Sequence, residues 1–544
     1  MTPLRRVAGR SVTTAEGLDP EVADRLVSAF VTHGASQCGF CTPGILCRLA
    51  PLGPAPARAQ VETALLAHLC RCTGWRTIVD AACSPVVAGA DDASQVFVYP
   101  PNRGDKRTPV DAGADDAAGT SPSATATTRV AGAYSAAGRR ASIEGGTPQR
   151  TGASVVLGGG GFADDTAPLG CLVAVPDGYG GWALGDSVAE ARAAAGQIPG
   201  RRSGQQLRYP LEVPPGDWDL TWQTTWVEPA YLEPDSSWCV PGGEPAHPAG
   251  NGGAFGGKVA STAPAAAREL ADRYGKPVRV VFSREDVVRY GPKRPPVAAG
   301  GRVDGTGVIR VVAAPGIVEA IRRVAPGVEV IAVDGIAGVT GPPVSAGIRA
   351  AGWSEAAILL AALGALAGGR VPSGPGDAVG TAAVTDPGGG RAEAVVTVDA
   401  AGWPALVETA VWCRDPLDET VVCSYATGAA HMALGWVCSE AIAVGADGRA
   451  EDLTVRSFGV LRARDTPPIR VRIERGRAGA AGSAGSAGSA AAAGSAGSAG
   501  SAGSAGSAGD PVRGSDAVFA AVAAATWIAQ GLPPRWPTRR GRTT

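Results

Sequence analysis

The chain has 544 residues, a hydrophobic content of 45% and a formal net charge of -1. A chain of this length can form two or three domains, each with a buried core. Charges of both signs are mixed along it, so no sustained field would attract nucleic acid or an anionic membrane. We therefore expect small molecules or proteins as partners, no nucleic acid and no membrane.

Two further features indicate a cytoplasmic protein. The start of the chain, after Arg5 and Arg6, lacks the apolar stretch of about 7–15 residues that a secretory signal needs. The most apolar window, Ala356 to Ala367, is shorter than the roughly 20 residues that span a bilayer, and we expect a buried helix there. The 11 cysteines are odd in number and mostly scattered, which is not typical of a disulfide framework.

Residues 1–85 are predicted to form a small all-α helical-bundle domain. Between Pro20 and Ala82 the apolar residues recur at helical spacing, and three prolines break the pattern once, between its two halves. The apolar positions are Val22, Leu26, Phe30, Ile45, Leu49, Leu65, Leu66, Leu69, Ile78 and Val79, and the prolines are Pro51, Pro54 and Pro56.

The rest of the chain is predicted to be a linker, an α+β region, a tether and a C-terminal helix. Residues 86–130 have little to bury and read as a linker, whereas 131–477 mix short strands with alanine-rich helices. Residues 478–509 contain only Ala, Gly and Ser and predict a flexible tether, and 510–544 hold a helix and a basic tail. The expected strands are Ser154 to Leu157, Cys171 to Val175 and Val278 to Phe282, and the expected helices are Ala263 to Tyr274 and Asp516 to Gln530.

Four cysteines in two close pairs form the clearest candidate metal site. Cys38 and Cys41 are followed, after a helical hairpin, by Cys70 and Cys72. Four thiolates can complete a 2Fe-2S cluster with two on each iron, and they can also bind one structural zinc. On spacing alone both metals stay open, although ligands only one residue apart suit zinc less well than gaps of two to four residues. We expect Cys47 and Cys83, outside this pattern, to be small buried residues.

The residues around these cysteines resemble one known family. The runs Cys-Gly-Phe-Cys-Thr-Pro-Gly, from Cys38, and Cys-Arg-Cys-Thr-Gly-Trp, from Cys70, resemble the helical 2Fe-2S domain of the xanthine dehydrogenase, aldehyde oxidase and carbon monoxide dehydrogenase family of molybdenum hydroxylases. The resemblance implies that the four cysteines bind a 2Fe-2S cluster. It also implies that Gln37, directly before the first cysteine, contacts the pterin of a molybdenum cofactor.

Later segments resemble the molybdopterin-binding subunit of the same family, in the same order. The run from Gly252 to Lys258 is similar to its Gly-Gly-x-Phe-Gly-Gly-Lys loop, which implies that Gly253, Phe255 and Gly256 approach the cofactor. Ile348 to Gly352 is similar to a motif whose arginine, here Arg349, lies beside the cofactor, although an ordinary surface arginine is an equal alternative. The run Val227 to Pro234 resembles a strand before the loop, and Thr427 to Trp436, with Glu440, resembles a glycine-rich helix start. We expect His431 to be a capped or core histidine.

The chain departs from the family where the family carries its catalytic glutamate. The resemblance places that residue just before the last helix, where this chain has the Gly-Ala-Ser tract ending at Asp510. A general base is a positioned carboxylate, and Asp510 is one methylene shorter and follows a flexible tract. Asp510 is the candidate catalytic residue, and we expect its competence to be impaired. The loop between Trp238 and Asn251 is also shorter than in the family.

These observations predict an α+β multidomain protein, a helical 2Fe-2S domain followed by a molybdopterin-binding-like region. The resemblance implies an oxidoreductase that passes electrons from a molybdenum-molybdopterin centre to a 2Fe-2S cluster and oxidises an aldehyde or an N-heterocycle. No FAD-binding or second ferredoxin-like segment is found, so a separate FAD or ferredoxin-type acceptor protein is expected, and a homodimer is one assembly to consider. The alternatives are a catalytically impaired electron-transfer protein and a structural zinc protein.

Overall fold

The fold is described from a computed structural model. It describes residues 7–84, 150–196, 211–248, 253–258, 261–333, 344–372, 378–412, 418–444, 450–451, 454–474 and 514–539. The predicted linker 86–130, the predicted tether 478–509 and Asp510 lie outside the described residues.

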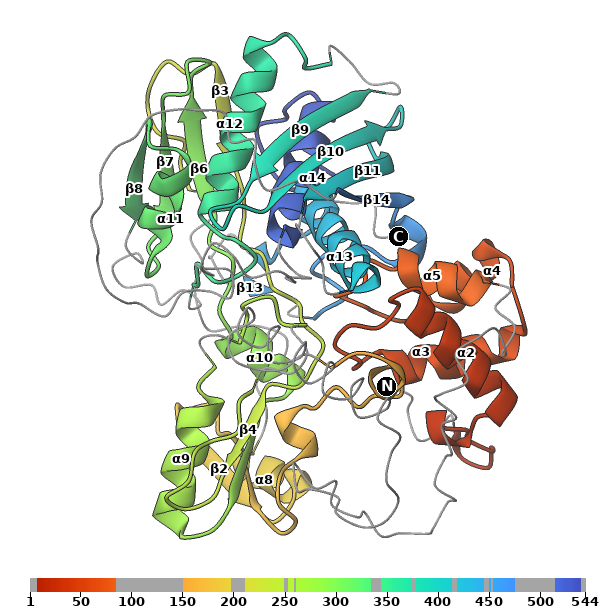
Figure 1. The fold of residues 1–544 in the computed structure, drawn as a ribbon. Helices are drawn as coiled ribbons and strands as arrows, with labels where there is room; N and C mark the ends of the chain where they lie inside the picture. The colour runs from red at the N-terminus through yellow and green to blue at the C-terminus, as the bar shows by residue number, and fades with distance from the viewer. Residues whose placement is uncertain are drawn as a thin grey trace, which may run out of the picture.

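The N-terminal part is a bundle of short helices, as predicted (Figure 1). Its longest helix begins at Pro20 because Asp19 accepts hydrogen bonds from the backbone N–H groups of Glu21 and Val22. Most apolar positions of the sequence pattern meet in one core around Phe30, Ile45 and Trp75. Leu66 is an exception, because its side chain is exposed. The elements are η1 (Ala15–Gly17), α2 (Pro20–Thr32), α3 (Thr42–Leu49), η2 (Ala50–Leu52), α4 (Arg58–Ala64) and α5 (Arg76–Cys83).

A first small sheet has the strand order β2-β1-β5-β4, with β1 parallel to β5 and the other pairs antiparallel. Helices α8 and α9 pack against its strands. The predicted strands at 171–175 and 278–282 and the helix at 263–274 are confirmed. The elements are α7 (Ala153–Val156), η3 (Ala163–Asp165), β1 (Leu172–Pro176), β2 (Trp182–Gly185), α8 (Val188–Ala195), β4 (Ser236–Cys239), α9 (Ala263–Tyr274), β5 (Val278–Val281) and α10 (Arg284–Tyr290).

Two of the strands expected from the sequence are wrong. Ser154 to Leu157 lies largely in the short helix α7, because a run with only three apolar residues fits one helical turn as well as a strand. Val227 to Pro234 forms only one isolated bridge, between Val227 and Arg294, and is otherwise loop. Pro229 and Pro234 lack the backbone N–H that a central strand must donate.

A second sheet has the strand order β3-β6-β7-β8 and packs on α11 and α12. Strands β7 and β8 are parallel, and α11 connects them. The predicted buried helix at 356–367 is confirmed as most of α12. The elements are β3 (Leu220–Gln223), β6 (Val297–Gly301), β7 (Gly307–Val312), α11 (Ile317–Val324), β8 (Val328–Val333) and α12 (Trp353–Ala367).

A third sheet, β14-β11-β10-β9, packs on the C-terminal helix α14, which lies next to α13 (Figure 1). Gly380 of β9 permits close contact between the sheet and α14, because a Cβ there would lie 2.0 Å from the carbonyl oxygen of Ala525. The predicted helix at 516–530 is confirmed as α14. The elements are β9 (Val379–Thr385), β10 (Arg391–Val398), β11 (Pro404–Trp412), α13 (Glu419–Cys438), β12 (Ala443–Val444), β13 (Ala450–Glu451), η4 (Ala463–Asp465), β14 (Ile469–Glu474) and α14 (Ser515–Ala529).

Helix α13 lies between the N-terminal bundle and the third sheet. Thr427 to Trp436, expected to start a helix, lie in the middle of α13, which begins at Glu419 after the capping residue Asp418. Within the described part of the chain, α13 alone has the length and apolar character of a membrane span, and 89% of that stretch is buried inside the protein. The burial is that of a core helix.

The bundle approaches α13 so closely that two glycines are required at the contact. A Cβ on Gly428 would lie 1.8 Å from the carbonyl oxygen of Cys72, and one on Gly74 would lie 2.5 Å from that of Thr427. Neither position can accept a side chain without moving backbone. The Cys70–Cys72 loop therefore packs directly on the middle of α13.

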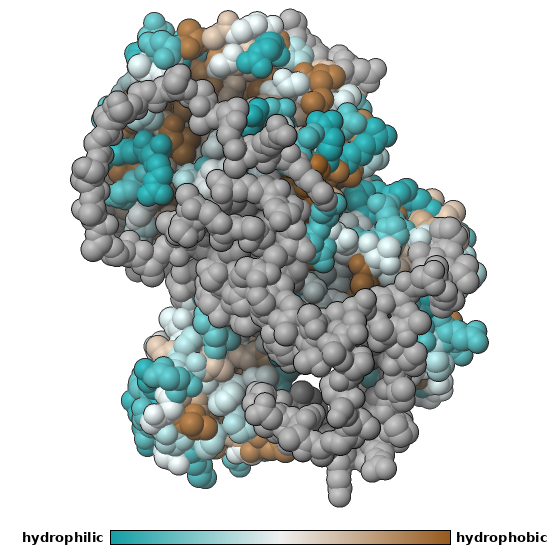
Figure 2. All heavy atoms as spheres, viewed as in Figure 1, coloured by the Kyte–Doolittle hydropathy of each residue, from teal (hydrophilic) through white to brown (hydrophobic). Residues whose placement is uncertain are grey.

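The exposed surface of the bundle in Figure 2 is mostly hydrophilic, with apolar residues in small separate spots.

We expect Gly428→Ala to lower the free energy of unfolding by about 1–3 kcal/mol or more, because the added methyl group overlaps backbone that cannot rotate away. Urea unfolding followed by tryptophan fluorescence measures it. The matched control is Gly364→Ala in α12, where a Cβ meets nothing within 4 Å. That change should be neutral or stabilise by up to about 1 kcal/mol. Equal effects of the two substitutions would contradict the close approach.

Candidate metal centre and adjoining cavity

The four predicted cysteines come together from two loops. Cys38 and Cys41 lie in the loop that leads into α3, and Cys70 and Cys72 lie between α4 and α5. The Sγ atoms of Cys38 and Cys72 are 3.5 Å apart, and the thiols of Cys41 and Cys70 are hydrogen-bonded to each other. Each pair therefore takes one cysteine from each loop.

This pairing suits a two-iron centre. Among the residues that the structure describes, no three His, Cys, Asp or Glu side chains meet closely enough to hold one metal ion. The thiols meet in two pairs, and a 2Fe-2S cluster needs two thiolates on each of its two irons. In such a cluster Cys38 and Cys72 would hold one iron, and Cys41 and Cys70 the other.

The protonation of the thiols also fits a positively charged occupant. The hydrogen bond from Cys41, followed by those from Thr73 and the loop backbone, lowers the pKa of Cys70 to about 6. The partner thiols and burial raise the pKa values of Cys41 and Cys72 well above their usual value. Four thiols so close together, three of them buried, cannot all ionise unless cations balance them, and iron would supply that charge. Cys47 and Cys83, expected to be buried, are only half-buried.

Gln37 belongs to the contact between the cluster loops and α13. Its Nε2 donates to the carbonyl oxygen of Cys72 at 3.1 Å and to Oγ of Ser424 at 2.9 Å. Ser424 in turn donates to the carbonyl oxygen of Gly34 at 2.6 Å. Gln37 is buried and positions the Cys70–Cys72 loop, and its role toward a pterin stays a prediction.

The glycine-rich loop lies directly on the cysteines. A Cβ on Gly253 would lie 3.1 Å from Sγ of Cys38, so the loop backbone comes close because it has no side chain there. A Cβ on Gly256 would lie 1.8 Å from the carbonyl oxygen of Gly347, close to Arg349 in the chain. The structure thus brings the glycine-rich loop between the cysteines and residues 347–349, and its approach to a molybdenum cofactor stays a prediction.

Arg349 is buried and not a surface residue. Its backbone N–H donates to the carbonyl oxygen of Phe255, and its guanidinium lies 4.8 Å from the centre of the Phe255 ring. Burial lowers its pKa to about 10, so it stays charged at neutral pH. Its Nε lies 3.7 Å from a carboxylate oxygen of Asp516, and Nε and Nη2 have no hydrogen-bond partner among the described residues. Arg349 therefore has free donors for an anionic or oxygen-rich ligand.

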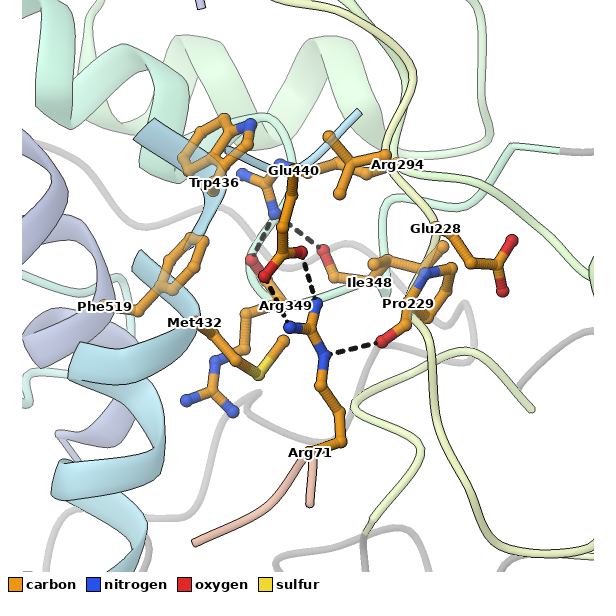
Figure 3. A pocket seen from close by; sticks show the side chains of 11 residues that line it. Arg71, Glu228, Pro229, Arg294, Ile348, Arg349, Met432, Trp436, Glu440 and Phe519 are labelled. Carbon is orange, nitrogen blue, oxygen red and sulfur yellow. Dashed lines mark hydrogen bonds and ion pairs between the residues drawn. The ribbon is translucent and has the colours of Figure 1, made fainter. Parts of the chain in front are cut away.

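A cavity lies between the Cys70–Cys72 loop, α13 and the Arg349 segment (Figure 3). Its volume is about 20 Å³, room for about one water molecule. Trp436 and Phe519 stack beside it with ring centres 5.3 Å apart. It is lined by Arg71, Val227, Glu228, Pro229, Arg294, Ile348, Arg349, Met432, Trp436, Glu440 and Phe519.

Buried ion pairs surround this cavity. The guanidinium of Arg71 meets Glu440 at 2.6 Å, that of Arg294 meets Glu355 at 2.7 Å, and the ammonium group of Lys293 meets Glu228 at 2.7 Å. Removing one member of a buried pair typically costs about 3–5 kcal/mol because it leaves a charge without a partner. In Figure 3 the carboxylate of Glu440 points to Arg71, whereas that of Glu228 points away from the centre.

The site residues fit a 2Fe-2S cluster in number, pairing and charge. For a molybdopterin, the free donors of Arg349 and the bare backbone of the glycine-rich loop provide suitable polar groups. The volume of about 20 Å³ is far too small for a pterin, so its binding requires the lining residues to move apart. Asp510, the predicted catalytic residue, lies outside the described residues.

Three residues of the site were not predicted as site residues, although Glu440 belonged to the run that resembles a glycine-rich helix start. Arg71 stands between two cysteine ligands, and its place inside the metal motif was the only signal for it. Glu440 meets Arg71, and Asp516 lies near Arg349, only because the fold brings these distant residues together. No sequence pattern around either carboxylate indicated its partner. His431 is a buried core histidine, as expected: its Nε2 bonds the carbonyl oxygen of Leu461, and burial, then the charge of Arg71, lowers its pKa to about 3.

Comparisons with known proteins agree with this site. Residues 14–83 match the family described as the 2Fe-2S binding domain. The chain is 42% identical over 86 residues to a probable xanthine dehydrogenase subunit of Bacillus subtilis, which is 15% of this chain and 50% of that protein. It is 46% identical over 76 residues to the nicotine 6-hydroxylase small subunit of Paenarthrobacter nicotinovorans, 13% of this chain and 46% of that protein. The chain thus spans about half the length of these relatives.

The fold as a whole is similar to a solved aldehyde oxidoreductase. The Desulfovibrio gigas enzyme matches with a TM-score of 0.59 and 15% identity over 99% of this chain and 92% of that one. The enzyme from Desulfovibrio desulfuricans matches with a TM-score of 0.59 and 13% identity over 96% of this chain and 91% of that one. At this identity the likeness concerns the fold alone.

The N-terminal bundle is thus a 2Fe-2S binding domain. The predicted resemblance to the molybdenum hydroxylase family is confirmed by sequence over this domain, and the fold of the chain is similar to that of the aldehyde oxidoreductases.

We expect Cys72→Ser and Cys41→Ser each to lose most of the bound iron, because each removes one thiolate of a different pair. Iron and acid-labile sulfide per chain, measured on anaerobically purified protein, check this. Cys47→Ser, a half-buried cysteine outside the pairs, should keep the iron content of the unmodified chain. Iron retained in either of the first two variants would contradict the assignment.

Proposed function

We propose that this protein is an electron-transferring oxidoreductase of the molybdenum hydroxylase type. In this proposal Cys38, Cys41, Cys70 and Cys72 hold a 2Fe-2S cluster. The molybdenum cofactor would bind on the side of the cluster where the cavity lies, next to the Cys70–Cys72 loop. The observation that carries it is the pairing of four thiols, three of them buried, at the point where the bundle meets α13 and the glycine-rich loop. A bound molybdenum cofactor would supply the two-electron oxidation of the substrate.

The residues of this chain support such a role by position and charge. Gln37 and Gly428 hold the backbone of Cys72 against α13, so the cluster loops stay fixed when the cluster gains or loses an electron. Arg349 offers a buried cation to an anionic ligand in the cavity. The buried, apolar walls formed by Trp436 and Phe519 exclude bulk water.

Substrate, acceptor and location are parts of the same proposal. The names of the similar proteins include a nicotine 6-hydroxylase subunit, an isoquinoline 1-oxidoreductase subunit and aldehyde oxidoreductases, which supports an N-heterocycle or an aldehyde as substrate. We propose that electrons leave to a separate FAD or ferredoxin-type protein. We further propose a cytoplasmic location, with a homodimer as the assembly to test.

We expect the full chain, produced anaerobically with the genes that supply molybdenum cofactor, to contain about two irons, about two acid-labile sulfides and molybdenum. Reduction with dithionite should bleach the visible absorption and produce the paramagnetic resonance signal of a reduced 2Fe-2S cluster. Colourless protein that contains zinc in place of iron would overturn the proposal and favour a structural zinc protein.

One observation favours a second candidate, an electron-transfer protein whose molybdenum half does not turn over. The cavity holds about one water molecule, and ion pairs surround it. Anaerobic addition of an aldehyde or N-heterocycle to the iron-loaded protein separates the two candidates. The hydroxylase proposal expects bleaching of the cluster by substrate, whereas this candidate expects bleaching by dithionite only and no molybdenum.

A further inference from the structure

Arg71, between the two cysteines of the second pair, extends its side chain into the body of the protein. Only 3% of the residue is exposed. Its Nη1 and Nη2 donate to the two carboxylate oxygens of Glu440 at 2.6 and 2.7 Å, and its Nε donates to the carbonyl oxygen of Pro229 at 2.9 Å (Figure 3). The Cys70–Cys72 loop is therefore attached to two distant segments through one guanidinium.

The surrounding residues fix Glu440 in the position that binds this guanidinium. Its backbone N–H donates to the carbonyl oxygen of Gly435 at 2.7 Å, which turns the chain at the end of α13. A Cβ on Gly435 would lie 2.1 Å from Oε1 of Glu440, so the carboxylate occupies space that any other residue would fill. Only 1% of Glu440 is exposed. The pair is thus a fixed, two-pronged contact and not a chance surface pairing.

Because Arg71 lies between two of the proposed cluster ligands, the charges of this pair can influence the reduction potential of the cluster. Reducing a 2Fe-2S cluster adds one negative charge, so a nearby cation favours the reduced state and a nearby anion disfavours it. Water and salt screen such effects at the surface but screen buried charges much less. Arg71 is bonded through the chain to both Cys70 and Cys72, and Glu440 balances its charge.

We propose that Arg71 and Glu440 are positioning residues that fix the Cys70–Cys72 loop and together set the reduction potential of the cluster. The inference rests on the proposed 2Fe-2S function. It assigns Glu440, which lies outside the cluster-binding domain and 369 residues from Arg71 in sequence, to the electron-transfer site.

The test measures the midpoint potential of the cluster in the full chain by redox titration followed by paramagnetic resonance. Glu440→Gln removes the anion and keeps the shape, so reduction should become easier and the potential should rise. Arg71→Met removes the cation, so the potential should fall. Each shift should correspond to about a tenfold change in the ratio of reduced to oxidised cluster, about 59 mV for one electron. The double variant should return close to the unmodified potential.

Two further variants separate charge from structure. Arg71→Lys keeps the charge but cannot make the two-pronged contact, so its potential should stay close to the unmodified value even if cluster content falls. If Arg71→Met does not assemble a cluster, the sign of the Glu440→Gln shift against the unshifted Arg71→Lys potential carries the test. Asp80→Asn is the matched control, because it removes a carboxylate from the exposed Arg58–Asp80 pair, whose side chains are 50% and 47% exposed, and should not shift the potential.

The outcomes distinguish this inference from the proposed function. An unmodified chain without iron or a resonance signal overturns the proposed function. An unmodified chain with a normal cluster, combined with an unshifted Glu440→Gln potential or with shifts of the same sign in Glu440→Gln and Arg71→Met, overturns only the role of the pair. Opposite shifts that cancel in the double variant support it.

Discussion

The structure depends on the contact between the Cys70–Cys72 loop and helix α13. The backbone of Cys72 lies so close to α13 that residue 428 must be glycine. Gln37 and Ser424 bond across the same contact, and Arg71 reaches through it to Glu440. A small helical bundle alone could gather four thiols, but only this contact brings them next to the cavity. The chemical proposal therefore rests on packing as much as on the metal ligands.

Much of the helical bundle and its metal site could be predicted from the sequence. The helical spacing of Leu26, Phe30 and Ile45 follows from a physical period that the chain itself shows, and the cysteine spacing is local. The strand expected at 154–157 was wrong, because three apolar residues do not distinguish one helical turn from a strand. The strand expected at 227–234 was also wrong, because Pro229 and Pro234 have no backbone N–H to donate to a neighbouring strand.

The rest of the site could not be predicted, because its contacts join residues far apart in the chain. Arg71 and Glu440 are 369 positions apart, and nothing in the local sequence of either residue identifies the other. For Arg349 the sequence left two alternatives, an ordinary surface arginine and one beside the cofactor, and only the fold shows that it is buried against Phe255. The sequence around Gly428 and Gly435 gives no reason why these helix positions must be glycine. The reason is structural, because a Cβ at 428 would overlap Cys72 and one at 435 would overlap Glu440.

The C-terminal helix α14 has a consequence for how this chain tolerates change. Its 15 residues are almost wholly enclosed by α13 and the third sheet, so burial holds it in place independently of the segment between Glu474 and Gly514. Doubling the length of a connecting loop costs only about 0.6 kcal/mol in closure entropy. The repeated gene segment that encodes this connection can therefore gain or lose many copies during evolution with little change in the free energy of unfolding of the core.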